Sequence, residues 1–421
     1  MDFKIRDRKY QEKLDEQTLA PYATKSAKAN KTRIHLENEH PYRTAIQRDR
    51  DRIIHSRAFR RLKHKQQVFL ISEGDHYRTR LTHTLEVSQL ARTLANALGL
   101  NEILVEAIAL GHDLGHTPFG HVGEVVLNDI LTGQDDLDGE LPHKNRGGFK
   151  HNYQSLRVLD RIEKKYQFEG LNLTSYVREG ILKHTRLLRE QYLYPEFCYE
   201  GLHYELDSAT TLESQVVAIC DEIAQRTHDL EDGIRAGLVE IEHVKMLKIV
   251  AMLEDKYAIK DLLKKDRYYY RNRLIHGLIN VLMDDVIKST LINIEEFYHR
   301  KKQLHFLDEE LVKFSSELNP LQLELNEFIY EEIIFKCAGN DFNNINKNML
   351  RQLFKRFVQK PLRLPDYVLK RIAPVSHGKI DGQERQKLTN EDCFIRNIAD
   401  YIAGMTDNFA KMESDKFENN K

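Results

Sequence analysis

Residues 76–124 read HYRTRLTHTLEVSQLARTLANALGLNEILVEAIALGHDLGHTPFGHVGE, and this stretch indicates both the fold and the chemistry of the chain. Two apolar helices are predicted in this stretch. The second runs from Ile103 to Leu114 and is stopped by Gly115 and Pro118. In the first, leucine recurs at helical spacing up to Gly99, a residue suited to ending a helix. The leucines are Leu81, Leu85, Leu90, Leu94 and Leu98.

Histidine is crowded into the same helices. A single histidine on an apolar helix face is usually a core residue whose ring nitrogens are satisfied by hydrogen bonds. Several histidines interleaved with Asp113 and Glu124 are instead typical of a metal or catalytic site. Five of the 19 histidines lie in this stretch, namely His76, His83, His112, His116 and His121, and His151 follows in a later block.

Metal ligation is the chemistry that these residues favour. On one helix the side chains of His112 and Asp113 diverge by about 100°, yet both reach one ion if the helix axis points past it. Imidazole and carboxylate together suit manganese, magnesium, iron, zinc or cobalt rather than a soft metal. His83 and Asp221 are candidates to complete the set. Asp221 lies in an apolar helix, where a carboxylate is costly unless it is paired or metal-bound.

A zinc-protease helix is the main rival interpretation. His112 and His116 have the i, i+4 spacing of such a helix. That motif needs glutamate after the first histidine as general base, whereas the chain has Asp113 there. Gly115 would also weaken a helix that must hold both ligands. The protease interpretation is therefore disfavoured.

The composition is that of a compact helical protein. The 421 residues are 41% hydrophobic and 31% charged with only 9 prolines, which leaves room for uninterrupted helices. A net charge of −1 gives no general case for nucleic-acid binding. Four scattered cysteines argue against a disulfide framework. The absence of an apolar signal segment or an 18-residue apolar run favours a cytoplasmic location without membrane contact.

We expect an all-α fold with at most short strands, for example around residues 67–71. The chain is divided into an N-terminal basic arm (1–40), a catalytic core (41–235) and a C-terminal helical region (236–421) that completes the fold and carries oligomer contacts. A polar, glycine-rich stretch, Thr132–Lys150, is predicted to be a mobile loop. Single helices are predicted from Arg43 to Val68 and from Asp392 to Phe409.

A basic run precedes the histidine-rich stretch. Between Arg43 and Lys65 there are nine lysines and arginines against two aspartates. Such a run is usually a solvated face, and it also suits a surface that binds a polyphosphate or another subunit. The members of most interest are Arg57, Arg60, Arg61, Lys63 and Lys65.

Five blocks of the chain resemble one family. RTRLTHTLEV, HDLGHTPFGHVGE, FKHNYQSLR, DEIAQRTHDLEDG and DYIAGMTDNFA are similar, in this order, to the deoxyguanosine triphosphate triphosphohydrolase (dNTPase) family of the HD superfamily of metal-dependent phosphohydrolases. The resemblance implies an HD-domain helical core with additional C-terminal helices. It also implies hydrolysis of a dNTP, with dGTP the leading candidate, to deoxynucleoside and tripolyphosphate.

The resemblance implies roles for individual residues. His121 is expected near the scissile bond, with Glu124 orienting or polarising it, and His116 and His151 near the phosphates or the attacking water. Arg80 is expected to grip the phosphate chain. Further substrate contacts are expected from Gln67, Lys183, Gln225 and Asp229, and the implied metal ligands are His83, His112, Asp113 and Asp221. A dNTP is also the expected allosteric effector, and the family's habit favours a homo-tetramer or homo-hexamer.

Two residues depart from the family's pattern, and two alternative functions stay open. Gln225 stands where the family more often has tyrosine to recognise the deoxyribose, and Gln66 stands where threonine is common, so the preferred base is undetermined. One alternative is an HD phosphohydrolase of another nucleotide. The other is a nucleotide sensor or single-stranded nucleic-acid binder, suggested by cations of the arm: Lys25, Lys28, Lys31 and Arg33.

Overall fold

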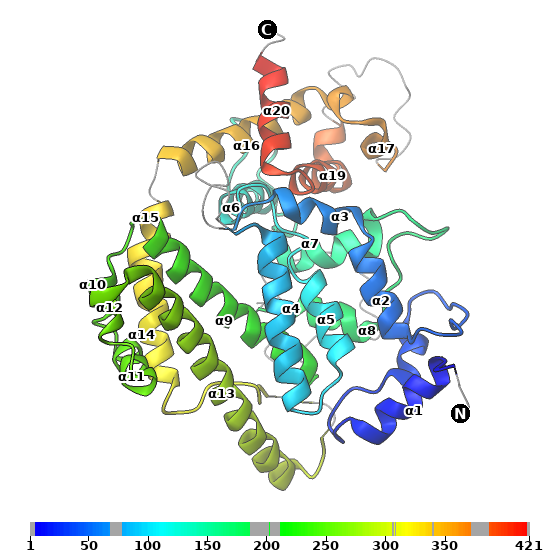
Figure 1. Ribbon diagram of the computed structural model, residues 1–421. Coiled ribbons are helices and arrows are strands. Elements are labelled where there is room, and N and C mark those ends of the chain that lie inside the picture. The colour runs from blue at the N-terminus through cyan, green and yellow to red at the C-terminus, as the bar shows by residue number, and fades with distance from the viewer. Residues whose placement is uncertain are drawn as a thin grey trace.

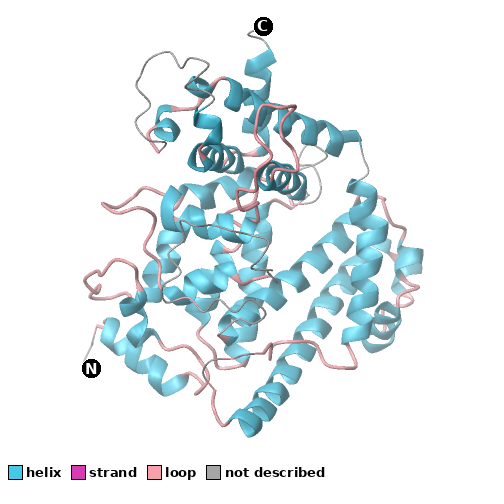
Figure 2. Cartoon of the chain, turned by 180° about the vertical axis from the view of Figure 1, so that it is seen from behind, coloured by secondary structure: helices cyan, strands magenta, loops and turns pink. Residues whose placement is uncertain are grey.

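The fold is helical throughout the part of the chain that the computed structural model describes, residues 5–67, 78–185, 202, 211–304, 307, 309–338, 341–371 and 387–418. Figure 2 shows helices joined by loops in these residues. Their extended pairings are two isolated bridges, Gln66–Thr79 and Lys164–Gly170. The expected all-α fold is confirmed. Of the short strand suggested at 67–71, all but Gln67 lies outside the described residues.

The helices follow one another in the order seen in Figure 1. They are α1 (Arg8–Thr18), α2 (Ala45–Ile54), α3 (Arg57–Arg61), α4 (Arg80–Ala97), α5 (Glu102–Gly111), α6 (His121–Thr132), α7 (His151–Arg157), α8 (Ser175–Leu182), α9 (Leu212–Arg235), α10 (Ile241–Val244), α11 (Lys248–Tyr257), α12 (Leu262–Lys265), α13 (Arg267–Lys301), α14 (Asn319–Ile329), α15 (Phe335–Ala338), α16 (Asp341–Gln359), α17 (Asp366–Leu369), α19 (Asp392–Ala403) and α20 (Asp407–Glu418). Short 3₁₀ turns cover Ser26–Thr32, Leu62–His64 and Pro361–Arg363, and π-helical turns cover Val158–Ile162 and Tyr330–Ile334.

Two hydrophobic clusters organise these helices. In the larger, α4 packs between α5 and α9, α2 covers α5, and α13 lies beyond α9 (Figure 1). In the smaller, α6, α16 and α19 pack together at the end of the molecule that carries the C-terminus. The connection from α5 to α6 passes from one cluster to the other, since Leu114 belongs to the larger and Phe119 to the smaller.

The two central helices begin and end as their sequences require. The side chain of Thr79 caps α4 by accepting from the backbone N–H of Thr82, and Asn101 caps α5 in the same way. Gly99 follows α4 with a φ of +67°, as predicted. Helix α5 ends at Gly111, three residues before the predicted end. A Cβ at Gly111 would lie 2.4 Å from the Ile181 side chain, so this glycine lets α8 pack closely.

Two of the predicted single helices are wrong, because each is two helices. Ser56 interrupts the helix expected from Arg43 to Val68 and caps α3 by accepting from the Phe59 N–H at 3.0 Å. The expected closing helix breaks at Gly404, and Thr406 caps α20. Serine and threonine compete with the helix for backbone donors, which explains both breaks.

The glycine-rich stretch after α6 contains no helix in the structure and is tied to the C-terminal helices. Arg351 of α16 forms ion pairs with Asp135 and Asp138 at 2.6 and 2.8 Å. Arg396 of α19 donates to the carbonyls of Gly148 and Arg146. These bonds hold the loop that leads into α7 against the smaller cluster.

The described part of the basic arm packs on the core. Arg33 forms a fully buried ion pair with Asp49 at 2.6 Å. Lys25 donates to the carbonyls of Leu19 and Ala20 at the end of α1. Two of the four cations that suggested nucleic-acid binding are therefore used in folding. The division of the chain at residues 40 and 235 stays a prediction.

Candidate metal centre

Four side chains from three helices meet at the centre of the larger cluster. His83 comes from α4, Asp221 from α9, and His112 with Asp113 from the turn that follows α5. Nε2 of His83 lies 2.9 Å from Oδ1 of Asp221, and Nε2 of His112 lies 3.6 Å from Oδ1 of both Asp113 and Asp221. The expected metal ligands are thus brought together.

The turn after α5 explains how neighbouring residues converge. Because α5 has ended at Gly111, His112 and Asp113 are not splayed around a regular helix. Gly115 is needed in this turn, since a Cβ there would lie 2.1 Å from the backbone nitrogen of Ser155 in α7. The glycine that seemed to weaken a helix therefore allows α7, which begins with His151, to approach the centre.

The donor atoms fit a divalent metal ion. The ligand atoms of His83, His112 and Asp113 lie within 4.8 Å of one another, and all three residues are buried. Nε2 of His112 is buried and has no hydrogen-bond partner among the described residues, and its distances to the carboxylates exceed hydrogen-bond length. An unpartnered imidazole nitrogen is costly unless it binds an ion. Two imidazoles and two carboxylates suit the metals named above.

Electrostatics also favour a cation at this point. Burial alone would raise the pKa of Asp113, but His116, Arg80 and His112 hold it well below its usual value. Burial acts in the same direction on the pKa of Asp221, which His112 and His83 hold low. Burial alone would lower the pKa of His112, yet Asp113 and Asp221 raise it to about 9. Two ionised carboxylates therefore draw positive charge to Nε2 of His112.

A second group of ionisable residues shares Asp113 with the first. Nε2 of His116 lies 2.9 Å from Oδ1 of Asp113, and the His116 ring stacks on that of His151 at 3.9 Å. Nδ1 of His151 lies 2.6 Å from Oε2 of Glu124, and Lys150 contacts Oε1 of Glu124 at 2.8 Å. The structure thus brings three of the four expected catalytic residues together around Asp113.

Glu124 and His121 are placed differently from the expected pair. Glu124 hydrogen-bonds His151 and Lys150, which hold its pKa well below the usual value against the opposing effect of burial. His121 is exposed at the first position of α6, and its ring centre lies 6.0 Å from that of His116. The carboxylate therefore orients His151, while His121 stands at the accessible side of the centre.

Of the expected substrate contacts, Arg80 and Gln67 lie beside the loop from α5 to α6. Arg80 is buried and donates to Oδ2 of Asp113 at 2.8 Å. A Cβ on Gly120 would lie 3.2 Å from the Arg80 guanidinium and 3.4 Å from the Gln67 carbonyl oxygen. Oε1 of Gln67 is buried and lacks a partner in the described part of the chain. Both residues border the loop that carries His116.

The other expected substrate contacts, Lys183, Gln225 and Asp229, come from the end of α8 and from α9. Lys183 follows α8 and contacts Glu179 at 3.1 Å. Gln225 is half-buried one helical turn beyond Asp221 on α9, and Asp229 is buried one turn further. Burial, and then Asp232, raise the pKa of Asp229 to about 8.

Sequence reasoning missed two histidines of this centre. Nε2 of His184 lies 3.3 Å from Nε2 of His151, and its ring centre lies 5.1 Å from that of His112. His228 lies on α9, with Nδ1 3.4 Å from Nδ1 of His83. The signal for His228 was available, because it follows Asp221 by seven residues, two helical turns on the same face. His184 carried a weaker signal, since it follows the end of α8.

The C-terminal block DYIAGMTDNFA packs against this loop and against α7. Asp407 accepts from the backbone N–H groups of Gln66 and Phe119, both at 2.9 Å. Asp400 accepts from Arg157 and Gln154 of α7. The position where the family often has threonine, Gln66, is therefore held through its backbone.

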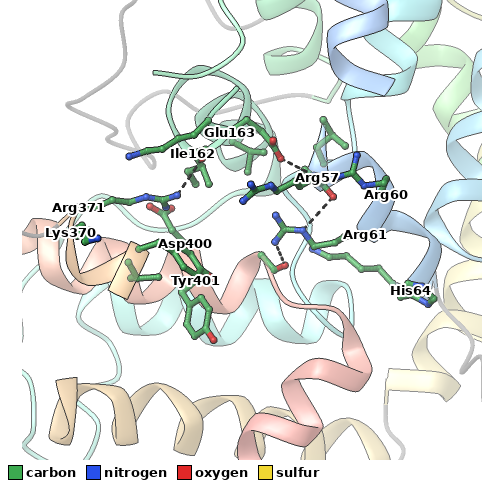
Figure 3. A pocket seen from close by; sticks show the side chains of 18 residues that line it. Arg57, Arg60, Arg61, His64, Ile162, Glu163, Lys370, Arg371, Asp400 and Tyr401 are labelled. Atoms are coloured by element: carbon green, nitrogen blue, oxygen red, sulfur yellow. Dashed lines mark hydrogen bonds between the residues drawn. The ribbon is translucent and has the colours of Figure 1, made fainter. Parts of the chain in front are cut away.

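A separate basic pocket of about 680 Å³ lies behind the α5–α6 loop. Figure 3 shows α3 contributing one wall, with Arg57, Arg60 and Arg61, and the end of α17 contributing Lys370 and Arg371 opposite. Lys65 and Leu114 form part of the lining. Four of the five cations singled out from the basic run thus line this pocket, and Lys63 does not.

Comparisons with known proteins agree with this architecture. Residues 80–226 match the HD domain family, and residues 312–416 match the phosphohydrolase-associated domain. The deoxyguanosinetriphosphate triphosphohydrolase-like protein 1 of Mesorhizobium japonicum is 39% identical over 94% of this chain and 93% of its own. Similarly named proteins of Syntrophus aciditrophicus and Brucella anthropi are 39% and 38% identical, over 96% and 94% of this chain and 94% of their own lengths.

The helical core and the histidine–aspartate centre define an HD-domain phosphohydrolase with a site for a divalent metal ion. More specifically, the chain belongs to the deoxyguanosinetriphosphate triphosphohydrolase-like family. Among the described residues, every helix is too short or too polar to cross a membrane.

Proposed function

We propose that the chain is a metal-dependent dNTP triphosphohydrolase, with dGTP the leading candidate substrate. The observation that carries the proposal is the sharing of Asp113 between two groups, the ligand set with His112 and the group with His116 and Arg80. The names of relatives that match more than nine tenths of the chain support the same reaction.

The reaction places demands that the chain's own residues meet. Water adds its hydroxyl group to the α-phosphorus, the bond to the 5′ oxygen breaks, and that oxygen takes a proton. A divalent ion, with manganese or magnesium favoured, would supply Lewis acidity toward the phosphate. Arg80 offers a cation beside Asp113 for the triphosphate. Its buried Nε has no partner in the described residues.

We assign the proton transfers of this reaction to the histidines. Glu124 fixes one nitrogen of His151 and leaves the other pointing toward His184, an orientation suited to hold the attacking water or a phosphate oxygen. Burial, and then Arg80 and His151, lower the pKa of His116 well below its usual value, so its ring is neutral. Burial lowers the pKa of His121 to about 4, and the nearby Glu124 carboxylate opposes that shift. We assign proton donation to the 5′ oxygen to His121, because it is the accessible member of the group and because the negative charge of a bound triphosphate would raise its pKa further.

Product analysis tests the proposal. Each dNTP is incubated singly and in mixtures with Mn²⁺ or Mg²⁺ in ¹⁸O-labelled water. The expected products are deoxynucleoside and tripolyphosphate, with the label in the tripolyphosphate. Release of deoxynucleoside monophosphate and pyrophosphate, or of orthophosphate, would contradict it. An HD phosphohydrolase of another nucleotide would instead keep its activity in Arg80→Ala while failing on all dNTPs.

We further propose that the basic pocket receives the effector dNTP. None of Arg57, Arg60 and Arg61 forms an ion pair with a described carboxylate, and the pocket lining holds seven lysines and arginines against Glu163 and Asp400, so positive charge is in excess there. A volume of about 680 Å³ suits a nucleotide. Lys65 lines the pocket and donates to the carbonyls of His116 and Ala403. A ligand there would contact the loop that carries Asp113.

Binding stoichiometry tests the effector site. Asp113→Ala enzyme, incapable of turnover under the proposal, is titrated with dGTP by calorimetry. Arg57→Glu/Arg61→Glu should remove one class of binding sites, whereas Lys63→Glu, an exposed change in the same run, should leave it. Identical isotherms in all three backgrounds would refute the effector site. Light scattering of the same samples, with and without dNTP, tests the proposed homo-tetramer or homo-hexamer.

A further inference from the structure

His83 differs from His112 in what holds its second ring nitrogen. Nδ1 of His112 lies 2.6 Å from the carbonyl oxygen of Ala109, one turn earlier in its own helix. Nδ1 of His83 instead faces a side chain of another helix, Nδ1 of His228 at 3.4 Å. The orientation of His112 is therefore built into the backbone, whereas that of His83 depends on His228.

The contacts of His228 continue outward. His228 is 4% exposed, and its ring stands edge-on to the His83 ring at 5.5 Å between centres. Nε2 of His228 lies 2.7 Å from Oε2 of Glu86, whose side chain is 43% exposed. Glu86 is in turn bound by Arg78 at 3.1 Å. A chain of contacts thus runs from the metal centre to the surface.

Helix geometry keeps this chain in register. His83 and Glu86 are three residues apart on α4, and Asp221 and His228 are seven apart on α9, so each pair lies on one helix face. Since α4 packs on α9, the same interface that sets His83 against Asp221 also sets Glu86 against His228.

Only one arrangement of protons satisfies all of these contacts with a metal at His83. A ligating nitrogen must present a lone pair, so Nε2 of His83 carries no proton and Nδ1 does. Nδ1 of His228 must then accept, which leaves its proton on Nε2, where it is donated to Glu86. Carboxylate, histidine and ligand histidine are linked in sequence, an outer-sphere arrangement that fixes the ligand's tautomer and ring orientation.

We propose that His228, held by Glu86, is a positioning residue that fixes His83 for metal binding. The inference rests on the proposed metal centre and does not depend on which phosphate ester is hydrolysed. Because His228 touches a ligand rather than the ion, its removal should weaken metal affinity without abolishing the fold.

Metal affinity of the full-length protein gives the test, with Co²⁺ as the probe, followed by calorimetry and by its visible absorption. His228→Ala should raise the dissociation constant by about 10–100-fold, the usual cost of losing an outer-sphere partner, and should alter the Co²⁺ spectrum. His228→Asn places an amide oxygen near the position of Nδ1, so it should recover most of the affinity. Glu86→Ala should give a smaller loss in the same direction.

Controls separate positioning from folding. Thr227→Val changes a neighbouring buried side chain whose hydroxyl bonds its own helix at Ile223 and Ala224, and it should leave Co²⁺ affinity unchanged. Melting temperatures in EDTA should be similar for His228→Asn, Glu86→Ala and wild type. Wild-type affinity and spectrum in His228→Ala would overturn the proposal, as would equal losses in His228→Ala and His228→Asn.

The proposed reaction can be refuted independently of the proposed role of His228. Tight Co²⁺ binding by the wild type together with products other than tripolyphosphate would refute the reaction and leave the role of His228 standing. Failure of the wild type to bind Co²⁺, Mn²⁺ or Mg²⁺ would overturn the role of His228 as well, since there would be no ligand to position.

Discussion

The metal centre and the basic pocket share the loop from α5 to α6 and differ in which charged or polar groups are left without a partner. In the metal centre every carboxylate has a histidine or arginine partner, and an imidazole nitrogen of His112 remains unsatisfied. In the pocket the α3 arginines have no carboxylate partner among the described residues. The charges of the first region therefore favour a cation, and those of the second favour an anion.

The comparison also shows how neighbouring residues serve different sites. Asp113 and Leu114 are adjacent, yet Asp113 faces the ligand set and Leu114 lines the basic pocket. Lys65 joins the two regions through the His116 carbonyl. Burial, and then the positive charge of Arg61, lower the pKa of Lys65 to about 7. A change of charge in the pocket would therefore change the protonation of Lys65.

The largest effect is expected from removing a metal ligand. Asp113→Ala should lower kcat/KM on dGTP by roughly 1000-fold or more, well beyond the 10–100-fold expected for an outer-sphere change, because Asp113 also anchors His116 and Arg80. Steady-state kinetics and metal content measure it. Asp135→Ala, which removes a carboxylate bound to Arg351 away from the centre, is the control. Comparable metal content and activity in both variants would disprove the assignment.

The next largest effect is measured by thermal denaturation, which tests whether the two regions bind ligands of opposite charge. At 100 times its dissociation constant a ligand stabilises by about 2.7 kcal/mol. Mn²⁺ should stabilise wild type and Arg57→Glu/Arg61→Glu but not Asp113→Ala. Inorganic tripolyphosphate in EDTA should stabilise wild type and Asp113→Ala but not Arg57→Glu/Arg61→Glu. If both ligands lost their effect in the same variant, the two regions would be one site.

Sequence reasoning succeeded where local pattern determines structure. The leucine periodicity and capping residues predicted α4 and α5, and the acid in the apolar segment of α9 predicted Asp221 as a partner of His83. It failed where contacts are tertiary. Nothing local to Glu124 shows that its carboxylate meets His151 rather than His121, because that depends on how α7 docks on Gly115.

The basic pocket illustrates the same limit. The run of arginines was visible in the sequence, but its opposite wall comes from Lys370 and Arg371, some 300 residues later. Which members of the run face inward depends on the break at Ser56, where a side-chain cap redirects the chain. A pattern of charge alone does not show where the helix bends.

A smaller effect is expected from the titration of Asp229, a buried carboxylate of α9 that is not bound in the metal centre or in the basic pocket. Its Oδ2 has no partner in the described residues, and burial raises its pKa to about 8 from 3.8. The folded state therefore holds this proton more firmly than the unfolded state, and the associated stability falls as pH rises from about 4 to 8.

Asp229→Asn should remove that slope. We expect the variant to exceed wild type at pH 8 by more than about 1.4 kcal/mol, the equivalent of one pKa unit, and to match it near pH 4. Urea denaturation of the metal-free proteins across this range measures the difference. A pH-independent difference would show that Asp229 is ionised in the folded state. A raised KM for dGTP in the same variant would identify its separate contact with substrate.

The smallest effect is expected at Gln225, at the edge of the metal centre. It lies one turn beyond Asp221 and is half-buried, so a larger ring there would contact the sugar of a nucleotide placed on the metal ligands. Gln225→Tyr should lower KM by several-fold, about 1 kcal/mol from aromatic contact, with little change in kcat, because no reacting atom is touched. Kinetics with all four dNTPs, and with the corresponding ribonucleotides, measure it. Gln225→Leu separates apolar contact from the ring, and an unchanged KM for every nucleotide in Gln225→Tyr would place the sugar elsewhere.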